Sequence, residues 1–247
     1  MIKGLYTASN GMIPRMTQQD AVANNLANMS TSGYKRSNMF MRELITADNA
    51  LDRVLGRERS QVTEYHLTDF SQGEFNPTNN KFDIALNGPG FFKVRDDQGA
   101  MFFTRSGQFK LDNNGYLVNK DNMFVLNDRF APMQIRGDEV EISGNGDIIV
   151  DGAYFQTIGL SDFSQNDYSS LEGVGAELFR NNGDIQEIRS SEATAFMQGY
   201  LEDSNVKSID EMVKMIEIHR MFELGQKTIQ IQDQSLQRVV TEVGVVR

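Results

Sequence analysis

The segment 208–247 repeats apolar side chains at a constant interval. Steps of seven residues reach Met215, Phe222, Ile229, Leu236 and Val243. The segment contains no proline, and its only glycines are Gly225 and Gly244. A seven-residue interval is typical of coiled coils. The pattern therefore predicts one long helix that packs against a partner helix.

The positions that complete this heptad are more polar. Counting by seven from Met212 gives His219, Gln226, Asp233 and Val240, of which only the two ends of the row are apolar. A polar residue at such a position fixes the register of a coiled coil at some cost in stability. We therefore expect weak pairing of this helix in isolation and a packing or register role for His219.

The first thirty residues supply a candidate partner helix. Spacings of three and four connect Ile2, Leu5, Ser9, Met12, Met16, Gln19, Ala23 and Leu26. Pro14 removes a backbone donor and crowds the preceding turn, which predicts a kink or a late helix start near Ile13. The turn residues between Asn28 and Gly33 then predict the end of the helix.

The central part of the chain, roughly 65–190, has the pattern of short strands. Apolar runs begin at Phe82, Phe91, Phe102, Phe109, Tyr116, Val140 and Ile148. Turn sequences rich in Asn, Gly and Asp separate them, at 87–90, 96–99, 112–115 and 144–147. Strands of this length and spacing, joined by Asn-Gly and Gly-Asp turns, predict an antiparallel β domain.

These patterns predict an α+β fold. Residues 1–35 and 200–247 would form a discontinuous, coiled-coil-like domain of terminal helices, and 65–199 a mainly antiparallel β-rich outer domain inserted between them. Residues 36–64 would link the two. Within that linker, Arg42 to Leu55 could form a short helix, while 56–60 has the charged composition of an exposed connection.

Composition narrows the classes of function. The 247 residues carry a formal charge of −10, with 24 basic and 34 acidic residues and no cysteine. This balance disfavours nucleic acid and anionic lipid as main partners, because both require clustered Lys and Arg. No apolar run is long enough to span a membrane, and the first residues lack the apolar core of a cleavable signal. We expect neither nucleic-acid binding nor direct membrane insertion.

The sequence offers little for catalysis. It contains two histidines, His66 and His219, and none of the common phosphate-binding or nucleophile motifs. The run 112–115 resembles part of a calcium loop, but it lacks the alternating ligands, so a hairpin turn is favoured. The carboxylate pairs of the β region are adjacent to turns and fit a solvated surface. We therefore expect no catalytic, cofactor-binding or metal-binding residue.

Three groups of residues resemble the flagellar rod and hook family. The first is 24–35, Asn-Asn-Leu-Ala-Asn-Met-Ser-Thr-Ser-Gly-Tyr-Lys. The second is 82–94, Phe-Asp-Ile-Ala-Leu-Asn-Gly-Pro-Gly-Phe-Phe-Lys-Val, followed by 103–109 and 114–118. The third is 201–207, Leu-Glu-Asp-Ser-Asn-Val-Lys, which leads into 211–216 and 220–223. Their order and spacing over nearly the whole chain are far more specific than any one of them.

The resemblance implies a structural subunit of the bacterial flagellar basal-body rod, a structure that crosses the periplasm. Such a subunit would leave the cell through the flagellar type III export apparatus without a cleaved signal. It would polymerise helically with copies of itself and neighbouring rod proteins, forming the drive shaft and axial export channel. The assembly residues implied are Ile2, Leu5, Met12, Met16, Asn24, Asn25, Leu26, Asn28, Gly33, Tyr34, Ser204, Asn205, Val206, Met212, Met215, Phe222, Ile229, Leu236 and Val243.

Within that family, 247 residues are too few for a typical hook subunit. The opening residues 1–8 and the short connection at 45–62 look more like the proximal rod type, FlgF, than the distal type, FlgG. Two readings of another class remain open: a β-domain binding or adaptor module dimerised by its helices, and, less favoured, a hydrolase hidden in the β domain.

Overall fold

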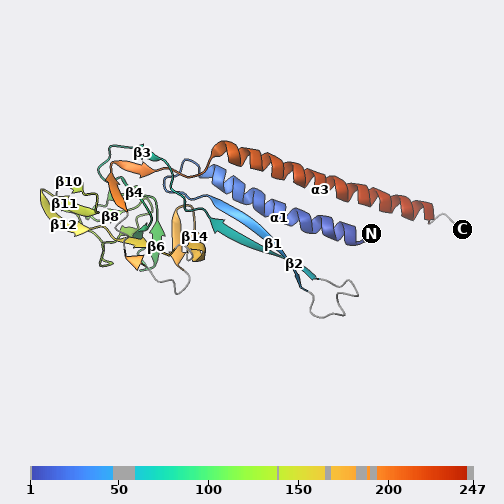
Figure 1. The fold of residues 1–247 in the computed structure, drawn as a ribbon, viewed down its shortest axis with the longest axis horizontal. Coiled ribbons are helices and arrows are strands. Elements are labelled where there is room, and N and C mark those ends of the chain that lie inside the picture. Colours follow the sequence, from blue (N-terminus) through green and yellow to red (C-terminus); the bar gives the residue numbers. More distant parts are fainter. Residues whose placement is uncertain are drawn as a thin grey trace. The chain divides into compact units, whose positions relative to one another are not determined.

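The computed structural model describes residues 2–46, 59–137, 139–164, 168–181, 188–189 and 194–243. The chain forms two compact units. We call residues 1–27, 37–68 and 207–247 the helical unit, and residues 28–36 and 69–206 the β unit. Figure 1 shows the elements of each unit along the chain. The α+β class predicted from the sequence is confirmed, and these unit boundaries differ from the predicted domain limits.

Two long helices form most of the helical unit. Helix α1 spans Ile2–Ala27 and helix α3 spans Ser208–Val243. They lie side by side and run in opposite directions (Figure 1). Because Pro14 lies inside α1, the predicted late start near Ile13 is wrong. Packing against a neighbouring element contributes most of the stability of a helix in a folded protein, and the contact with α3 offsets the missing donor. Neither described helix is apolar enough over sufficient length to cross a membrane.

The buried side of α3 confirms one predicted row and corrects the other. The least exposed described positions follow alternating steps of four and three: Glu211, Met215, Ile218, Phe222, Gly225, Ile229, Gln232 and Leu236. The row from Met215 to Leu236 is the predicted one, whereas its complement lies one residue earlier than predicted. Met212, His219, Gln226 and Asp233 are exposed. His219 instead lies 3.4 Å from the Glu223 carboxylate on the helix surface, so the predicted packing role is wrong.

The buried side of α1 also differs from the predicted one. Pro14, Val22 and Asn25 are buried, while Met16 and Ala23 of the predicted row are exposed. Polar side chains in a two-helix seam make the choice of face ambiguous from spacing alone, because a shift of one residue preserves the heptad interval. The side chains of Ile2, Leu5 and Val243 lie outside the described residues.

A hairpin completes the helical unit. Strand β1, Ser37–Thr46, pairs antiparallel with β2, Arg59–Thr68. The predicted helix is therefore wrong over residues 42–46, and its remainder, 47–55, lies outside the described residues. The predicted linker, 36–64, contains β1 and the first part of β2. Their pairing supplies backbone hydrogen bonds that a bare linker would leave to water.

The β unit consists of short strands, and every described pair is antiparallel. The predicted runs correspond to β4 Ile84–Asn87, β5 Phe91–Arg95, β6 Met101–Thr104, β7 Lys110–Leu111, β8 Leu117–Val118, β10 Val140–Ile142 and β11 Asp147–Val150. The others are β3 Phe75–Pro77, β9 Phe124–Val125, β12 Ala153–Thr157, β13 Leu160–Asp162, β14 Leu171–Val174, β15 Leu178–Asn181, β16 Ile188–Arg189, β17 Ala195–Gln198 and β18 Tyr200–Glu202. A 3-10 turn, η1, spans Tyr168–Ser170.

The largest sheet runs in the order β14-β15-β6-β5-β9-β8-β7. Its central strand β5 is buried along Phe91 to Val94, so its two faces contribute to two separate cores. Phe92 belongs to the larger core and Phe91 to a smaller aromatic core. Alternate side chains of a strand point to opposite faces, which explains why neighbouring phenylalanines enter different cores.

Candidate functional site

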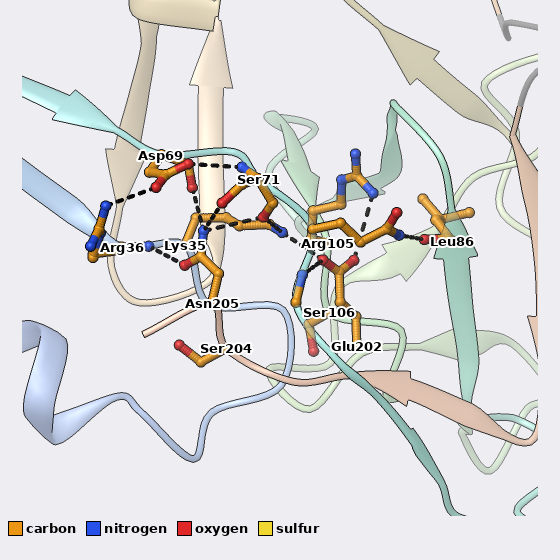
Figure 2. Close-up of polar contacts among 12 residues, drawn as sticks. Lys35, Arg36, Asp69, Ser71, Leu86, Arg105, Ser106, Glu202, Ser204 and Asn205 are labelled. Atoms are coloured by element: carbon orange, nitrogen blue, oxygen red, sulfur yellow. Dashed lines mark hydrogen bonds and ion pairs between the residues drawn. The ribbon is translucent and has the colours of Figure 1, made fainter. Parts of the chain in front are cut away.

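The three motif groups of the sequence meet in the β unit. In Figure 2, Lys35 of the first group lies together with Arg105 and Ser106 of the second and with Glu202, Ser204 and Asn205 of the third. The backbone N–H of Gly33 donates to the carbonyl of Glu202 at 2.7 Å. Sequence segments that are far apart along the chain thus form one polar cluster, which we call the clasp.

Glu202 is the centre of the clasp. Its Oε1 accepts hydrogen bonds from Lys35 Nζ at 2.6 Å and from the Gly73 N–H at 2.9 Å. Its Oε2 lies 3.6 Å from Arg105 Nη1. The side chains of Lys35 and Glu202 are fully buried, and that of Arg105 is 5% exposed. The clasp therefore buries two cations around one carboxylate.

The remaining contacts of the two cations anchor them to the fold. Lys35 Nζ also donates to the Ser71 carbonyl at 2.8 Å. Arg105 Nη1 donates to the Gly88 carbonyl at 2.9 Å, and its guanidinium lies 5.2 Å from the centre of the Phe91 ring. Burial lowers the pKa of Lys35, an effect that the Glu202 carboxylate opposes. Burial likewise lowers the pKa of Arg105, again against the attraction of Glu202. Both shifts express the cost of removing a cation from water.

Further contacts of the clasp join Arg36, Asp69 and Asn205, which lie at or next to the positions where the chain passes between the β unit and the helical unit. Asn205 Oδ1 accepts from the Arg36 N–H at 2.8 Å, and its Nδ2 donates to the Asp69 carbonyl at 2.7 Å. Arg36 Nη2 lies 3.0 Å from Asp69 Oδ2. Partial burial raises the pKa of Asp69, but hydrogen bonds from Ser71 and the charge of Arg36 outweigh it and hold that pKa below its usual range.

Two glycines allow the segments to approach this closely. A Cβ on Gly33 would lie 2.3 Å from the Ser106 nitrogen, and Gly33 also has a φ of +72°. A Cβ on Gly73 would lie 2.0 Å from the Asp203 carbonyl oxygen. Only glycine fits positions where two backbones are in contact, so both are fixed by the clasp.

The helical unit has its own buried polar group, Asn25. Its amide donates to the Ser37 carbonyl at 2.9 Å and accepts from the Ser37 N–H at 2.9 Å. It also donates to Glu211 Oε2 at 3.1 Å, while Lys214 donates to Glu211 Oε1 at 2.8 Å. One amide thus joins α1, β1 and α3. Asn24, the other half of the Asn-Asn pair, is exposed.

An apolar stripe lies on the other side of α3. It consists of Ile209, Val213, Ile216, Leu224 and Ile231, each 50% to 74% exposed. Because a helix turns about 100° per residue, these positions face away from the row that begins at Met215. We call this set the outer stripe. Exposed apolar rows of this length mark contact surfaces.

The predicted assembly residues divide between these places. Asn25 lies in the helical polar group, and Gly33 and Asn205 lie in the clasp, where Tyr34 is also buried. Ser204 adds a local turn by accepting from the Val206 N–H at 3.2 Å. Met12, Leu26, Asn28, Val206 and the row from Met215 to Leu236 are partly buried, while Met16, Asn24 and Met212 are exposed.

The sequence prediction omitted the charged centre of the clasp. Lys35 is the last residue of the first motif group, Arg105 lies within the second, and Glu202 is the second residue of the third. A partial signal was present, because Lys35 follows Tyr34 and Glu202 follows Leu201. Arg105, by contrast, lies between the polar residues Thr104 and Ser106. Pairing them needed the tertiary fold. Among the described residues, no group of three His, Cys, Asp or Glu side chains could hold a metal ion.

The chain thus has the α+β fold class, with a unit of two long helices and a β unit in which the three motif groups meet. Comparison with known proteins identifies its family. Residues 5–35 match the family model described as flagella basal body rod protein, 85–150 the flagellar hook protein FlgE/F/G D1 domain, and 197–242 the flagellar basal body rod FlgEFG protein C-terminal.

Whole-length relatives agree with these matches. The chain is 32% identical to the flagellar basal-body rod protein FlgG of Borreliella burgdorferi, over 96% of this chain and 97% of the relative. It is 31% identical to the flagellar basal-body rod protein FlgF of Caulobacter vibrioides, over 90% of each. It is 30% identical to FlgG of Buchnera aphidicola subsp. Schizaphis graminum, over 97% of this chain. The chain belongs to the flagellar basal-body rod protein family, a family of structural proteins.

Proposed function

We propose that this rod-family chain polymerises helically with copies of itself and neighbouring rod proteins, and that its helical unit makes the coiled-coil-like contacts. The assembled subunits would form the drive shaft and the axial export channel. The outer stripe of α3 is the observation that carries the proposal. Its helix already packs one side against α1, yet it presents a second apolar side to solvent. Burying that side in a neighbouring copy removes apolar area from water.

The α1 surface supports the same reading. Ile13 and Met16 are 57% and 54% exposed, although both are large apolar side chains. A helix pair with apolar rows on its outside has the surface of a repeating unit, because heterologous contacts that do not close produce helical filaments. Access to this assembly would be through the flagellar type III export apparatus, and the site of action would be the rod where it crosses the periplasm.

We favour the proximal rod type, FlgF. The opening residues 1–8 and the short connection at 45–62 support it. Two relatives from one organism, Caulobacter vibrioides, add a matched comparison: FlgF is 31% identical over 226 residues and FlgG 27% identical over 266. The distal type, FlgG, is the second candidate, because relatives of that name align with 96% to 97% of this chain at about 30% identity.

Deleting the gene and imaging the basal bodies tests both parts of the proposal. A rod-family subunit predicts rods that end below the hook, and the level at which they end separates proximal from distal action. Complementation with a chain that lacks residues 1–35 and 208–247 tests the role of the helical unit. Incorporation of that trimmed chain into rods would exclude helix-mediated assembly.

A separate measurement distinguishes the adaptor reading. We expect a purified chain that is monomeric in dilute solution, because the outer stripe needs several neighbours to be covered. A stable dimer with strong amide protection along both helices would favour a binding module instead.

A further inference from the structure

The last segment of the β unit, residues 195–202, contributes two strands and a core side chain to parts of the fold that precede it in sequence. Strand β17 pairs with β4, and β18 pairs with β3. Phe196 of β17 enters the larger core, 6.2 Å from the Phe92 ring centre. A Cβ on Gly146 would meet the Phe196 ring at 2.6 Å, so the rest of the fold leaves space for this ring. Residues 195–202 therefore complete a core whose other members come from much earlier in the chain.

Gln198 repeats this pattern with polar contacts. Its amide donates to the carbonyls of Lys81 and Val140 at 2.9 and 3.1 Å, and it accepts from the Ile142 N–H at 3.0 Å. One side chain of β17 thus joins the loop before β4 to strand β10. Both the apolar and the polar contacts of this segment bridge parts of the β unit.

Glu202 adds a charge requirement. Lys35 and Arg105 are buried on either side of its carboxylate, at 2.6 and 3.6 Å. Without residue 202, packing the domain in its native form would bury two cations without this counter-ion. An unpaired buried charge is far more costly than an unpaired surface charge. The native arrangement of residues 35 and 105 therefore depends on a residue near the end of the chain.

We propose that Glu202 closes the β unit, which acquires its native core only after residues 195–202 have docked. A chain is synthesised from its N-terminus, so most of the β unit is complete in sequence long before this segment is made. The dependence keeps that part of the chain unfolded until its C-terminal end is present. This folding dependence does not rest on the proposed function in rod assembly.

Hydrogen exchange on the purified full chain measures the closure directly. The amides of β5 and β6 report on the native core. We expect Glu202→Gln to lower their protection by about 100-fold or more, because removing one partner leaves buried charge unpaired. Glu172→Gln is the matched control, since the Glu172 carboxylate is 3.8 Å from Arg180 and both side chains are about half exposed. It should change protection by less than about threefold.

A rescue variant separates charge from packing. Adding Lys35→Met to Glu202→Gln removes one of the two unpaired cations, so we expect protection about tenfold above that of the single variant. The rescue is informative even if Glu202→Gln alone is unfolded. Three outcomes would each overturn the proposal. The double variant could remain unfolded, or it could be less protected than Glu202→Gln because the two losses of protection add. Alternatively, Glu202→Gln could lose no more protection than the control Glu172→Gln.

Refolding kinetics test the order of events. Glu202→Asp keeps the charge but shortens its reach, so the chain can still fold. If docking of 195–202 precedes core formation, this variant slows the appearance of protected β5 and β6 amides by nearly its full equilibrium effect. A normal refolding rate with only faster unfolding would show that the core forms first, and would reject the closing role without bearing on rod assembly.

Discussion

The helical unit and the β unit differ most clearly in charge. The β unit contains 12 of the 24 basic and 22 of the 34 acidic residues, which gives it a formal charge of −10. The helical unit has 12 of each and a formal charge of zero. The whole net charge of the chain therefore belongs to the β unit. A net charge keeps free subunits soluble and apart, and a neutral surface lets copies approach.

They differ equally in where their apolar side chains lie. Among the described residues of the β unit, sixteen buried side chains form the larger core and a mainly aromatic group forms the smaller one. In the helical unit, large apolar side chains of both helices remain at least about half exposed. Under the proposed function, the β unit holds a stable monomer together, while the helical unit keeps its apolar surface for neighbouring subunits. Four variants, the last of them a double variant, test this division in order of decreasing effect on the stability of the monomer.

Phe92→Ala should have the largest effect. The side chain is fully buried and packs edge-on against Phe109 at 5.0 Å between ring centres. Removing a buried phenylalanine costs about 3–5 kcal/mol. Urea unfolding followed by near-ultraviolet circular dichroism measures the loss, with Tyr154→Ala, whose side chain is 67% exposed, as the control. A loss as small as the control's would mean that the β unit does not hold the monomer together.

Asn25→Ala should weaken the helical unit by about 1–3 kcal/mol, because it leaves the buried Glu211 carboxylate and the partly buried backbone groups of Ser37 without their amide partner. We expect faster amide exchange in α1 and β1, and unchanged exchange in β5. Asn24→Ala, at the exposed neighbouring position, is the matched control. Equal effects of the two variants would show that the buried amide does not join the three elements.

Asp69→Asn should change the acid stability of the β unit. Because the folded pKa of Asp69 lies below its ordinary value of 3.8, its contribution is present above about pH 4 and is lost as the pH falls through the folded pKa. The variant should therefore be less stable than the parent chain at pH 7, with the difference narrowing toward pH 2. Urea midpoints at several pH values measure it. Asp97→Asn, the same substitution at an exposed position, is the matched control.

Leu224→Gln and Ile231→Gln should change the monomer least, within about 0.5 kcal/mol, because both side chains are already exposed. Their effect should appear in assembly, as loss of rod incorporation and motility. Glu223→Gln, an exposed polar change on the same helix, should leave assembly intact. Normal rods from the double variant would show that neighbouring subunits do not cover the outer stripe. That result would reject the proposed role of the helical unit in assembly.

Several elements could be predicted from local pattern. The strands that begin near Phe91 and Val140 are predicted correctly, because short apolar runs bounded by turn sequences rich in Asn, Gly and Asp specify strands locally. The row of α3 from Met215 to Leu236 was also correct. Its complementary row was displaced by one residue, since Gly225 and Gln232 are weak apolar signals and the sequence alone does not show which side faces α1.

The hairpin β1–β2 was missed for a related reason. Residues 42–46, Arg-Glu-Leu-Ile-Thr, contain both helix-forming and strand-forming side chains, so propensity does not decide between them. Pairing with a strand that begins at Arg59 decides it. Asn25 gave a partial success: the motif marked it as an assembly residue, but its role in joining α1, β1 and α3 depends on where the other two elements lie.

The sequence by itself determined the two kinds of structure, their order along the chain, the long heptad row and the motif groups that identify the family. Those features depend on local spacing and on residue type, both of which are present in the linear chain. Only the tertiary structure decided that Lys35, Arg105 and Glu202 share one buried cluster, and that α3 has apolar rows on both sides with only one covered within the unit. Burial and charge pairing are properties of surroundings, and the surroundings of Glu202 come from residues more than 90 positions away in sequence.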